Sequence, residues 1–184
     1  MLEKLRQEAE VCKQCGLAES RNLVVFGEGD PGSGMVLVGE APGAKEDLCG
    51  RPFVGLAGQL LSQALEKAGI PREGVFITSV VKCRPPKNRL PNRLEVEACL
   101  PHLNRQLEIM KPRIIVCLGS LSTRTLLDPR AKITEIRGKW FDQDGIKIMP
   151  VFHPAAILRN RNNTDQFVED LRQAGELWKK SSDT

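Results

Sequence analysis

Short apolar runs that end at a glycine alternate with helical segments along this chain. Residues Met35–Val38 are all apolar and precede Gly39, whereas Leu56–Ala68 carries apolar residues at three- and four-residue spacing and stops at Gly69. The first pattern predicts a buried strand and the second a helix with one apolar face. A chain that alternates such elements builds a mostly parallel sheet, because each helix carries the chain back to the starting edge of the next strand.

The same alternation continues to the end of the sequence. Further strands are expected at Val75–Val81 and Arg113–Leu118, a hairpin around Gly145 at Lys139–Gln143 and Ile146–Val151, and helices at Arg93–Met110, interrupted near Pro101, in a short segment from Gly119, and at Thr164–Lys180. The fold class we predict is α/β: a three-layer α/β/α sandwich with a central, mostly parallel sheet. A chain of 184 residues buries one core well and two poorly, so we expect residues 1–184 to form a single domain.

Ligands of such sheets bind beyond the carboxyl ends of the strands. The loops expected at that edge follow Val38, Val81, Leu118 and Val151. The first loop, GEAPGAKEDLCGRPFVG at residues 39–55, is rich in glycine and charged residues, which suits a backbone that approaches a ligand closely. The segment Gly27–Gly34 contains a G-x-G-x-x-G pattern, but it precedes a strand instead of opening a helix. It therefore predicts a turn, and we expect no nucleotide cofactor.

The composition narrows the class of protein. The N-terminal residues MLEKLRQEAEVCKQC mix acidic, basic and single apolar residues, so they predict neither a signal peptide nor a membrane-spanning helix. We expect a cytoplasmic protein with no membrane partner. The formal net charge of +4 permits a polyanionic partner without requiring one. Six cysteines in a reducing compartment argue against a disulfide framework and for metal, cluster or reactive roles in some of them.

Two cysteine pairs have the spacing of a metal site. Cys12 and Cys15 form a C-x2-C pair, and Cys83 and Cys99 are separated by fifteen residues. Four thiolates at these spacings suit tetrahedral zinc or an iron–sulfur cluster, and the spacing alone does not separate the two. Cys117 lies in an apolar strand and is expected to be a buried thiol, and Cys49 in the glycine-rich loop is interpreted as a bystander.

Several motifs in one order resemble a known family. They are GEAPGAKED and GRPFVG within residues 39–55, VVKCRPPKNR at 80–89, FHPAAILRN at 152–160, and the two cysteine pairs. Together they resemble the family 4 uracil-DNA glycosylases, the iron–sulfur members of that superfamily. The resemblance implies a DNA repair enzyme, an N-glycosyl hydrolase that flips uracil out of DNA and cuts its glycosidic bond to leave an abasic site. It also implies a [4Fe-4S] cluster bound by Cys12, Cys15, Cys83 and Cys99. We expect a monomer that acts on uracil-containing DNA.

The resemblance also assigns a uracil pocket. A base inside a duplex must be turned out into a pocket before its glycosidic bond can be cut. Phe53 in GRPFVG would stack on the flipped base, and ordinary core packing is its alternative role. The backbone of Glu40 and Ala41, in the loop that continues through Pro42, would bind the uracil carbonyls.

Two residues are expected to carry the chemistry. Cleavage leaves positive charge on the sugar and negative charge on uracil, so the site needs a donor at the base and a carboxylate near the sugar. His153 in HPAAIL is expected to donate to uracil O2 as a neutral imidazole whose second nitrogen is fixed by a neighbour. Glu40 is expected to stabilise the sugar cation or to orient the water, with Glu46 and Asp47 as alternatives. His102 has no predicted role.

Ser79 departs from the family pattern. The family usually has asparagine before VVKCRPP, and the acceptor and donor of asparagine match the N3–H and O4 edge of uracil. Serine is shorter and makes one contact. Two hypotheses follow: slower uracil excision with looser selectivity, or a shift toward another deaminated base. A non-cleaving module that binds uracil or damaged DNA remains a second class of function, and an electron-transfer protein a third.

Basic residues are expected to contact the DNA backbone, with a solvated surface as their alternative role. They are Lys82, Arg84, Lys87, Arg89, Arg93, Arg159 and Arg161. We interpret the iron–sulfur cluster as a structural centre that holds the loop at 82–93 in place, rather than as a redox centre. The loop after His153 is expected to insert Ile157 or Leu158 into the gap left by the flipped base, and the sequence does not choose between them.

Overall fold

One of the two central strands of the sheet is β2 (Met35–Gly39), at the position predicted from the first apolar run. The computed structural model describes residues 1–182. Within these residues the sheet has six strands in the order β1-β3-β2-β4-β6-β5, of which β3 (Phe76–Ser79), β2, β4 (Ile114–Leu118) and β6 (Ile146–Val151) are parallel. The short strands β1 (Glu28–Gly29) and β5 (Phe141–Gln143) pair antiparallel at the two edges.

The chain changes direction across the sheet at β2. After β2 it forms α4 (Leu56–Lys67) and returns as β3 on one side, and after β3 it forms α5 (Arg93–Met110) and crosses to β4 on the other side. The chain segments that follow β2 and β4 therefore lead away to opposite sides. In open α/β sheets, such a switch point at the carboxyl ends of the strands is the usual place of a ligand site.

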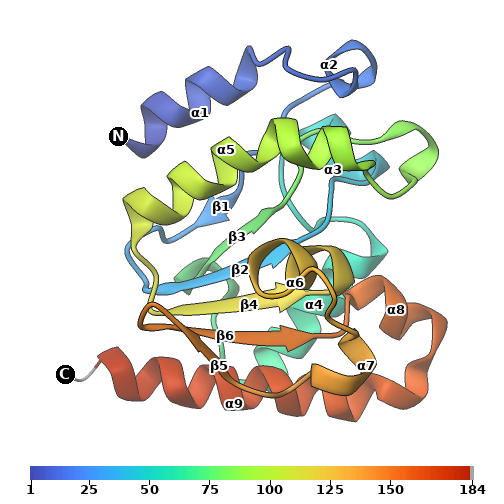
Figure 1. Cartoon of the computed structure of the whole chain (residues 1–184). Helices are drawn as coiled ribbons and strands as arrows, with labels where there is room; N and C mark the ends of the chain where they lie inside the picture. Colours follow the sequence, from blue (N-terminus) through green and yellow to red (C-terminus); the bar gives the residue numbers. More distant parts are fainter. Residues whose placement is uncertain (183–184) are drawn as a thin grey trace.

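Helices cover both faces of the sheet, which confirms the predicted α/β/α sandwich (Figure 1). The helices α4, α8 (Pro154–Arg159) and α9 (Thr164–Ser182) pack on one face, and α1 (Leu2–Glu10), α5 and α6 (Ser120–Leu126) pack on the other. Side chains alternate between the two apolar cores, so that Leu37 and Val116 face α4 whereas Val36 and Ile115 face α5. Burial on both faces explains why the strands appear as uninterrupted apolar runs in the sequence.

Helix α5 continues through Pro101 without the predicted interruption. A proline in a helix interior removes one hydrogen bond and costs about 3 kcal/mol or more. Cys99 and Leu103 are buried on the same helix against the sheet, and Asn92 and Glu95 form a capping box at its start. These contacts offset the cost of the proline, so the predicted interruption is wrong.

Several short elements have no counterpart among the predicted ones. Besides α8, they are α2 (Leu17–Ser20), α3 (Ala44–Cys49), α7 (Ile133–Ile136) and the 3-10 turns η1 (Arg72–Gly74), η2 (Pro86–Asn88) and η3 (Arg161–Asn163). Each is too short to show a helical period in the sequence. Among residues 1–182, every helix is too short or too polar to cross a membrane.

Candidate active site

The ends of the four parallel strands bring the candidate residues together. Glu40 directly follows β2, Ser79 ends β3, Gly119 follows β4, and His153 lies two residues after β6. Since these strands are parallel neighbours, their carboxyl ends form one edge of the sheet. Residues that are far apart in the sequence therefore meet at the switch point between β2 and β4.

Gly119 lies between the candidate acid and the candidate imidazole. A Cβ atom at this position would lie 2.8 Å from His153 Cβ and 2.9 Å from Glu40 Oε1. The φ angle of Gly119 is +99°, a conformation that favours glycine. Glu40 and His153 thus approach the same point of the backbone from two strands. No pattern in the sequence singles out Gly119, because its importance lies in what surrounds it.

The Glu40 side chain is partly buried at the end of β2. Burial raises the pKa of this carboxyl, while a hydrogen bond from the backbone N–H of Leu121 and the charge of Arg159 act in the opposite direction. The backbone carbonyl of Glu40 accepts from the N–H of Val81 at 3.0 Å. A backbone contact between Glu40 and a base would therefore use the Glu40 amide.

The His153 ring is oriented by the helix that it begins. Its Nδ1 accepts a hydrogen bond from the backbone N–H of Ala155 at 3.0 Å, so in the neutral ring the proton is on Nε2. Burial lowers the pKa of His153 to about 4, and the charge of Arg159 contributes in the same direction. At neutral pH the side chain is an uncharged imidazole with Nε2–H as its donor, which is the state expected from the sequence.

Phe53 lies beside His153. The two ring centroids are 5.8 Å apart and the ring planes are inclined by 36°. The ring also packs on Gly39, where a Cβ would lie 2.5 Å from Phe53 Cζ and 3.3 Å from Ser79 Oγ. Phe53 is 9% exposed and belongs to the apolar core beside α4, so it packs in the core and borders the candidate site at the same time.

The other two acids of the glycine-rich loop hold its backbone in place. Glu46 Oε1 accepts hydrogen bonds from the N–H groups of Val54 at 2.9 Å and Gly55 at 2.8 Å. Asp47 is buried and accepts from the backbone and side-chain N–H groups of Asn22, at 2.8 and 2.5 Å. These contacts give both acids a structural task in fixing the loop.

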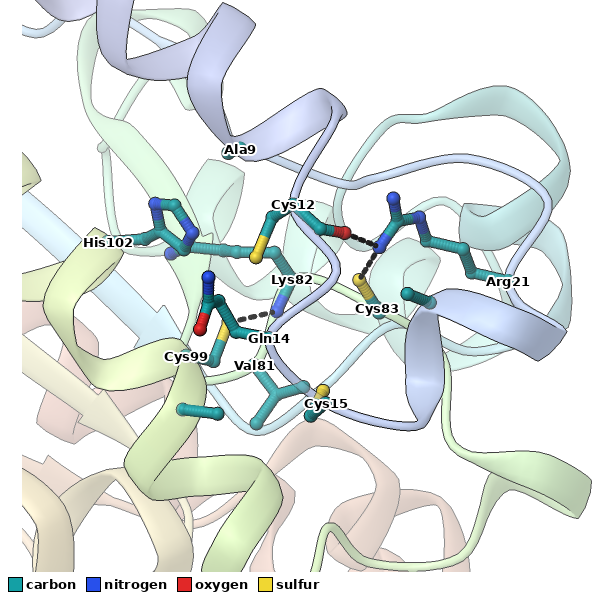
Figure 2. Close-up of a pocket in the computed structure, with 12 residues that line it drawn as sticks. Ala9, Cys12, Gln14, Cys15, Arg21, Val81, Lys82, Cys83, Cys99 and His102 are labelled. Atoms are coloured by element: carbon teal, nitrogen blue, oxygen red, sulfur yellow. Dashed lines mark hydrogen bonds between the residues drawn. The ribbon is translucent and has the colours of Figure 1, made fainter.

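The four cysteines of the expected cluster site line one cavity (Figure 2). Cys12 and Cys15 come from the segment between α1 and α2, Cys83 from the loop after β3, and Cys99 from α5. The empty space among the lining side chains, including its mouth to solvent, is about 340 Å³, and His102 also lines it. Within the described residues, no three His, Cys, Asp or Glu side chains converge as one metal ion requires. Four thiols around one cavity are a donor set that suits zinc or an iron–sulfur cluster.

Donors and positive charge surround the cysteine sulfurs. Arg21 donates to Cys83 Sγ at 3.4 Å and to the Cys12 carbonyl at 2.8 Å, and the backbone N–H of Lys82 donates to Cys99 Sγ at 3.3 Å. Burial raises the pKa of Cys83 to about 11, although Arg21 lowers it. A thiolate at this position therefore needs further positive charge.

The basic segment at 82–93 offers less charge to DNA than its sequence predicts. Lys82 is 1% exposed, and its ammonium donates to the Ser79 carbonyl at 2.6 Å, so the expectation that Lys82 contacts DNA is wrong. Arg89 binds both carboxylate oxygens of Glu95, at 2.8 and 2.7 Å. Lys87 lies on the exposed surface. One cation is thus part of the core and another is paired with a carboxylate.

The structure separates the two wedge candidates. Ile157 is fully buried in the core beside α4, whereas Leu158 is only partly buried at the edge of that core. A side chain that inserts into DNA has to protrude from the protein surface. The buried Ile157 is therefore excluded as the wedge. Arg159 and Arg161, in the same segment, are exposed. Leu158 is therefore the remaining wedge candidate, and it lies in the same segment as the exposed Arg159 and Arg161.

Comparison with known proteins finds relatives over nearly the whole chain. Residues 26–174 match the uracil DNA glycosylase superfamily. The chain is 47% identical over 178 residues to the type-4 uracil-DNA glycosylase of Pyrobaculum aerophilum, covering 92% of this chain and 91% of the relative. It is 43% identical over 184 residues to the type-4 uracil-DNA glycosylase of Thermotoga maritima, covering 98% and 96%. Identity to the type-5 uracil-DNA glycosylase of Pyrobaculum aerophilum is 33% over 165 residues, 79% of this chain and 73% of the relative.

Proposed function

This chain belongs to the uracil-DNA glycosylase superfamily and, within it, to the type-4 uracil-DNA glycosylases, and we propose that it removes uracil from DNA by hydrolysing the N-glycosidic bond. One observation carries the proposal: Glu40 and His153 flank the same glycine, and the Phe53 ring lies 5.8 Å from the imidazole. A carboxylate, a neutral imidazole and an aromatic ring are the groups that an enzyme needs to cut the sugar bond of a flipped base.

Binding begins with the uracil nucleotide turned out of the stack. Phe53 stacks on the base, since its ring borders the candidate site beside the His153 imidazole. The amides of Glu40 and Ala41, held by the buried Pro42 that follows them, bind the uracil carbonyls. Ser79 meets the remaining polar edge of the base, because its hydroxyl lies beside Gly39, on which the Phe53 ring also packs.

Glu40 and His153 then stabilise opposite charges. The Nε2–H of His153 donates to uracil O2, and Ala155 fixes the ring so that no reorientation is needed. The ionised Glu40 stabilises the positive charge on the sugar and orients a water molecule. The C1′–N bond breaks and uracil leaves as an anion that takes a proton from solvent. The water adds to C1′ and loses a proton, which leaves an abasic site. Glu46 and Asp47 are less suited to this task, because both bind backbone groups.

The cysteine cavity would hold a [4Fe-4S] cluster through Cys12, Cys15, Cys83 and Cys99. When bound, the cluster supplies metal–thiolate bonds that tie together the segment after α1, the loop after β3 and helix α5. It thereby holds the loop that starts at Cys83 against the rest of the protein. This is a structural role, and the hydrolysis uses none of its electrons.

The substrate would be uracil-containing DNA, bound by a cytoplasmic monomer without a nucleotide cofactor. The exposed Lys87, Arg159 and Arg161 provide charge for phosphate contacts. Leu158, in the helix α8 that His153 begins, would fill the gap that the flipped base leaves. Contacts to phosphates do not depend on the base sequence and are sensitive to salt. We therefore expect DNA binding to weaken as the salt concentration rises.

A nicking assay tests the proposed reaction. The purified protein is incubated with one uracil-containing oligonucleotide, and alkali then cleaves any abasic site. We expect cleavage at the uracil position, with strong losses in Glu40→Gln and His153→Asn. A cluster-loaded protein that binds this DNA but produces no alkali-labile site would instead be a non-cleaving binder.

A glycosylase with altered base specificity is the second candidate. The observation that favours it is the position of Ser79 Oγ, which lies against Gly39 at the point where the Phe53 ring packs. A residue at this place reads the base edge, and serine offers fewer contacts than asparagine. The rates of release of uracil, hypoxanthine and xanthine from matched duplexes decide between the two.

A further inference from the structure

Phe53 has a backbone conformation that needs support from its surroundings. Its φ angle is +50°, in the left-handed region that is unfavourable for a residue with a Cβ atom. Helix α4 approaches this turn so closely that a Cβ at Gly58 would lie 1.9 Å from the carbonyl carbon and oxygen of Phe53. The ring can remain beside His153 only if neighbouring groups hold the strained turn.

Arg72 binds the carbonyl groups of this turn. Its Nη1 donates to the Phe53 carbonyl at 3.0 Å, and its Nη2 donates to the Pro52 carbonyl at 2.6 Å. The guanidinium is itself fixed by Ser62 Oγ at 2.9 Å and by Glu28 Oε1 at 3.1 Å. The Arg72 side chain is only 21% exposed, so water competes little for these contacts.

Glu46 binds the next two residues of the same turn. Its carboxylate accepts the N–H groups of Val54 and Gly55. A cation thus holds the carbonyls at positions 52 and 53, and an anion holds the amides at positions 54 and 55. Hydrogen bonds to charged groups are stronger than those between neutral ones, and the two sets act on both sides of the strained residue.

We propose that Arg72 is a positioning residue for uracil recognition, which holds the backbone of Phe53 so that its ring faces the flipped base. The planar guanidinium suits this role, because one fork reaches two successive carbonyls while its other contacts keep it in place. Arg72 lies in η1, outside every motif of the family resemblance, so the sequence gives no signal for it. The inference rests on the proposed stacking role of Phe53.

A double-mutant cycle tests this inference. Uracil release is measured in single turnover with saturating enzyme for the wild type, Arg72→Ala, Phe53→Ala and the double variant, at a temperature where all are folded. We expect Arg72→Ala to lower the rate about 10- to 100-fold, since a misplacement of about 1 Å costs up to that much. In the Phe53→Ala background the same substitution should cost less than about threefold, because a residue that acts through Phe53 has nothing left to position.

Two further variants keep the test decisive. Arg51→Ala is the matched control, because Arg51 binds the same Glu28 carboxylate from the exposed side, at 2.8 Å, and it should cleave at the wild-type rate. If Arg72→Ala does not fold, Arg72→Lys replaces it in the cycle. Lysine keeps the positive charge next to Glu28 but lacks the planar guanidinium that binds two carbonyls at once. It should lose several-fold in rate only when Phe53 is present.

The outcomes separate this inference from the function on which it rests. Equal losses for Arg72→Ala, or for Arg72→Lys, with and without Phe53 would overturn the positioning role, as would full activity of the Arg72 variants. Full activity of Phe53→Ala would refute the stacking role of Phe53 and the inference with it, while uracil release by the wild type would still stand.

Discussion

The rings of Phe53 and His153 lie 5.8 Å apart between centroids, at an inclination of 36°. One ring follows β2 and the other follows β6, so two loops from distant parts of the chain border one site. The distance lies within the range in which aromatic rings are in contact. In the proposed function, this adjacency makes a stacking surface and a hydrogen-bond donor available to the same base.

Gly119→Ala should abolish most activity while the fold persists. The added Cβ would lie 2.8 Å from His153 Cβ and 2.9 Å from Glu40 Oε1, so it displaces both groups, and we expect a loss of uracil release of about 100-fold. Gly145→Ala is the matched control, because Gly145 also has a positive φ of +82° but no heavy atom within 4 Å of its Cβ position. Equal activity of the two variants would contradict the proposed site.

The His153→Asn variant should separate catalysis from stability. We expect about a 100-fold or greater loss of excision, while the Asn oxygen still accepts the N–H of Ala155 at the start of α8.

The same variant should change how stability depends on pH. The folded-state pKa of His153 is about 4, below its ordinary 6.5, so between these values the unfolded chain binds a proton that the folded protein does not. The contribution of His153 to the free energy of unfolding is therefore fully present above pH 6.5. It decreases by no more than about 3 kcal/mol as the pH falls toward 4. Urea unfolding across this range should show a smaller decrease in His153→Asn than in the wild type, because burial also lowers the pKa of His102, which both proteins retain.

Ser79→Asn should speed uracil release. Asparagine adds a donor or an acceptor at the end of β3, beside Gly39 and Phe53, and we expect about a tenfold higher rate on uracil with no gain on hypoxanthine or xanthine. A fall in hypoxanthine or xanthine release on substitution would instead support a shifted specificity. Unchanged rates on all three bases would show that Ser79 does not read the base.

Cys83→Ser should remove the metal centre, whereas Cys49→Ser should not. Cys83 lines the cysteine cavity and Cys49 is exposed in α3, so both variants lose one thiol but only the first loses a proposed ligand. We expect Cys83→Ser to lose absorbance at about 400 nm and bound iron, and to unfold at a lower temperature. Zinc in place of iron in the purified wild type would contradict the cluster assignment.

Leu158→Ala should change the rate of excision, whereas Ile157→Ala should change the stability of the fold. Leu158 is only partly buried in α8, the helix that His153 begins, so its truncation should slow excision about tenfold from a duplex and little from a single strand, where no gap has to be filled. Ile157 is fully buried, so its truncation should lower the free energy of unfolding by about 2–5 kcal/mol and leave the strand preference unchanged. Denaturant unfolding and paired excision assays distinguish the two.

Much of the fold follows from local patterns in the sequence. The apolar runs at Met35–Val38 and Arg113–Leu118 predict strands because both of their faces are buried, and the structure confirms them within one residue at each end. Local patterns are less reliable at Pro101. The burial of α5 outweighs the local preference of proline to end a helix. Short elements such as α3 lack a full period, so only the structure reveals them.

The sequence alone determined which chemical groups are candidates for the site. Glu40, Phe53 and His153 lie within runs of contiguous residues, and such runs can be recognised without coordinates. The cysteine spacings likewise identified four thiols but left zinc and iron–sulfur open, and the structure shows that all four line one cavity.

Only the tertiary structure decided what the other candidates do. Lys82 is in the core, Glu46 binds backbone amides, Ile157 is buried, and Arg72 holds the turn of Phe53. The physical reason is that burial and hydrogen-bond partners arise between residues distant in the chain, and no local pattern encodes them.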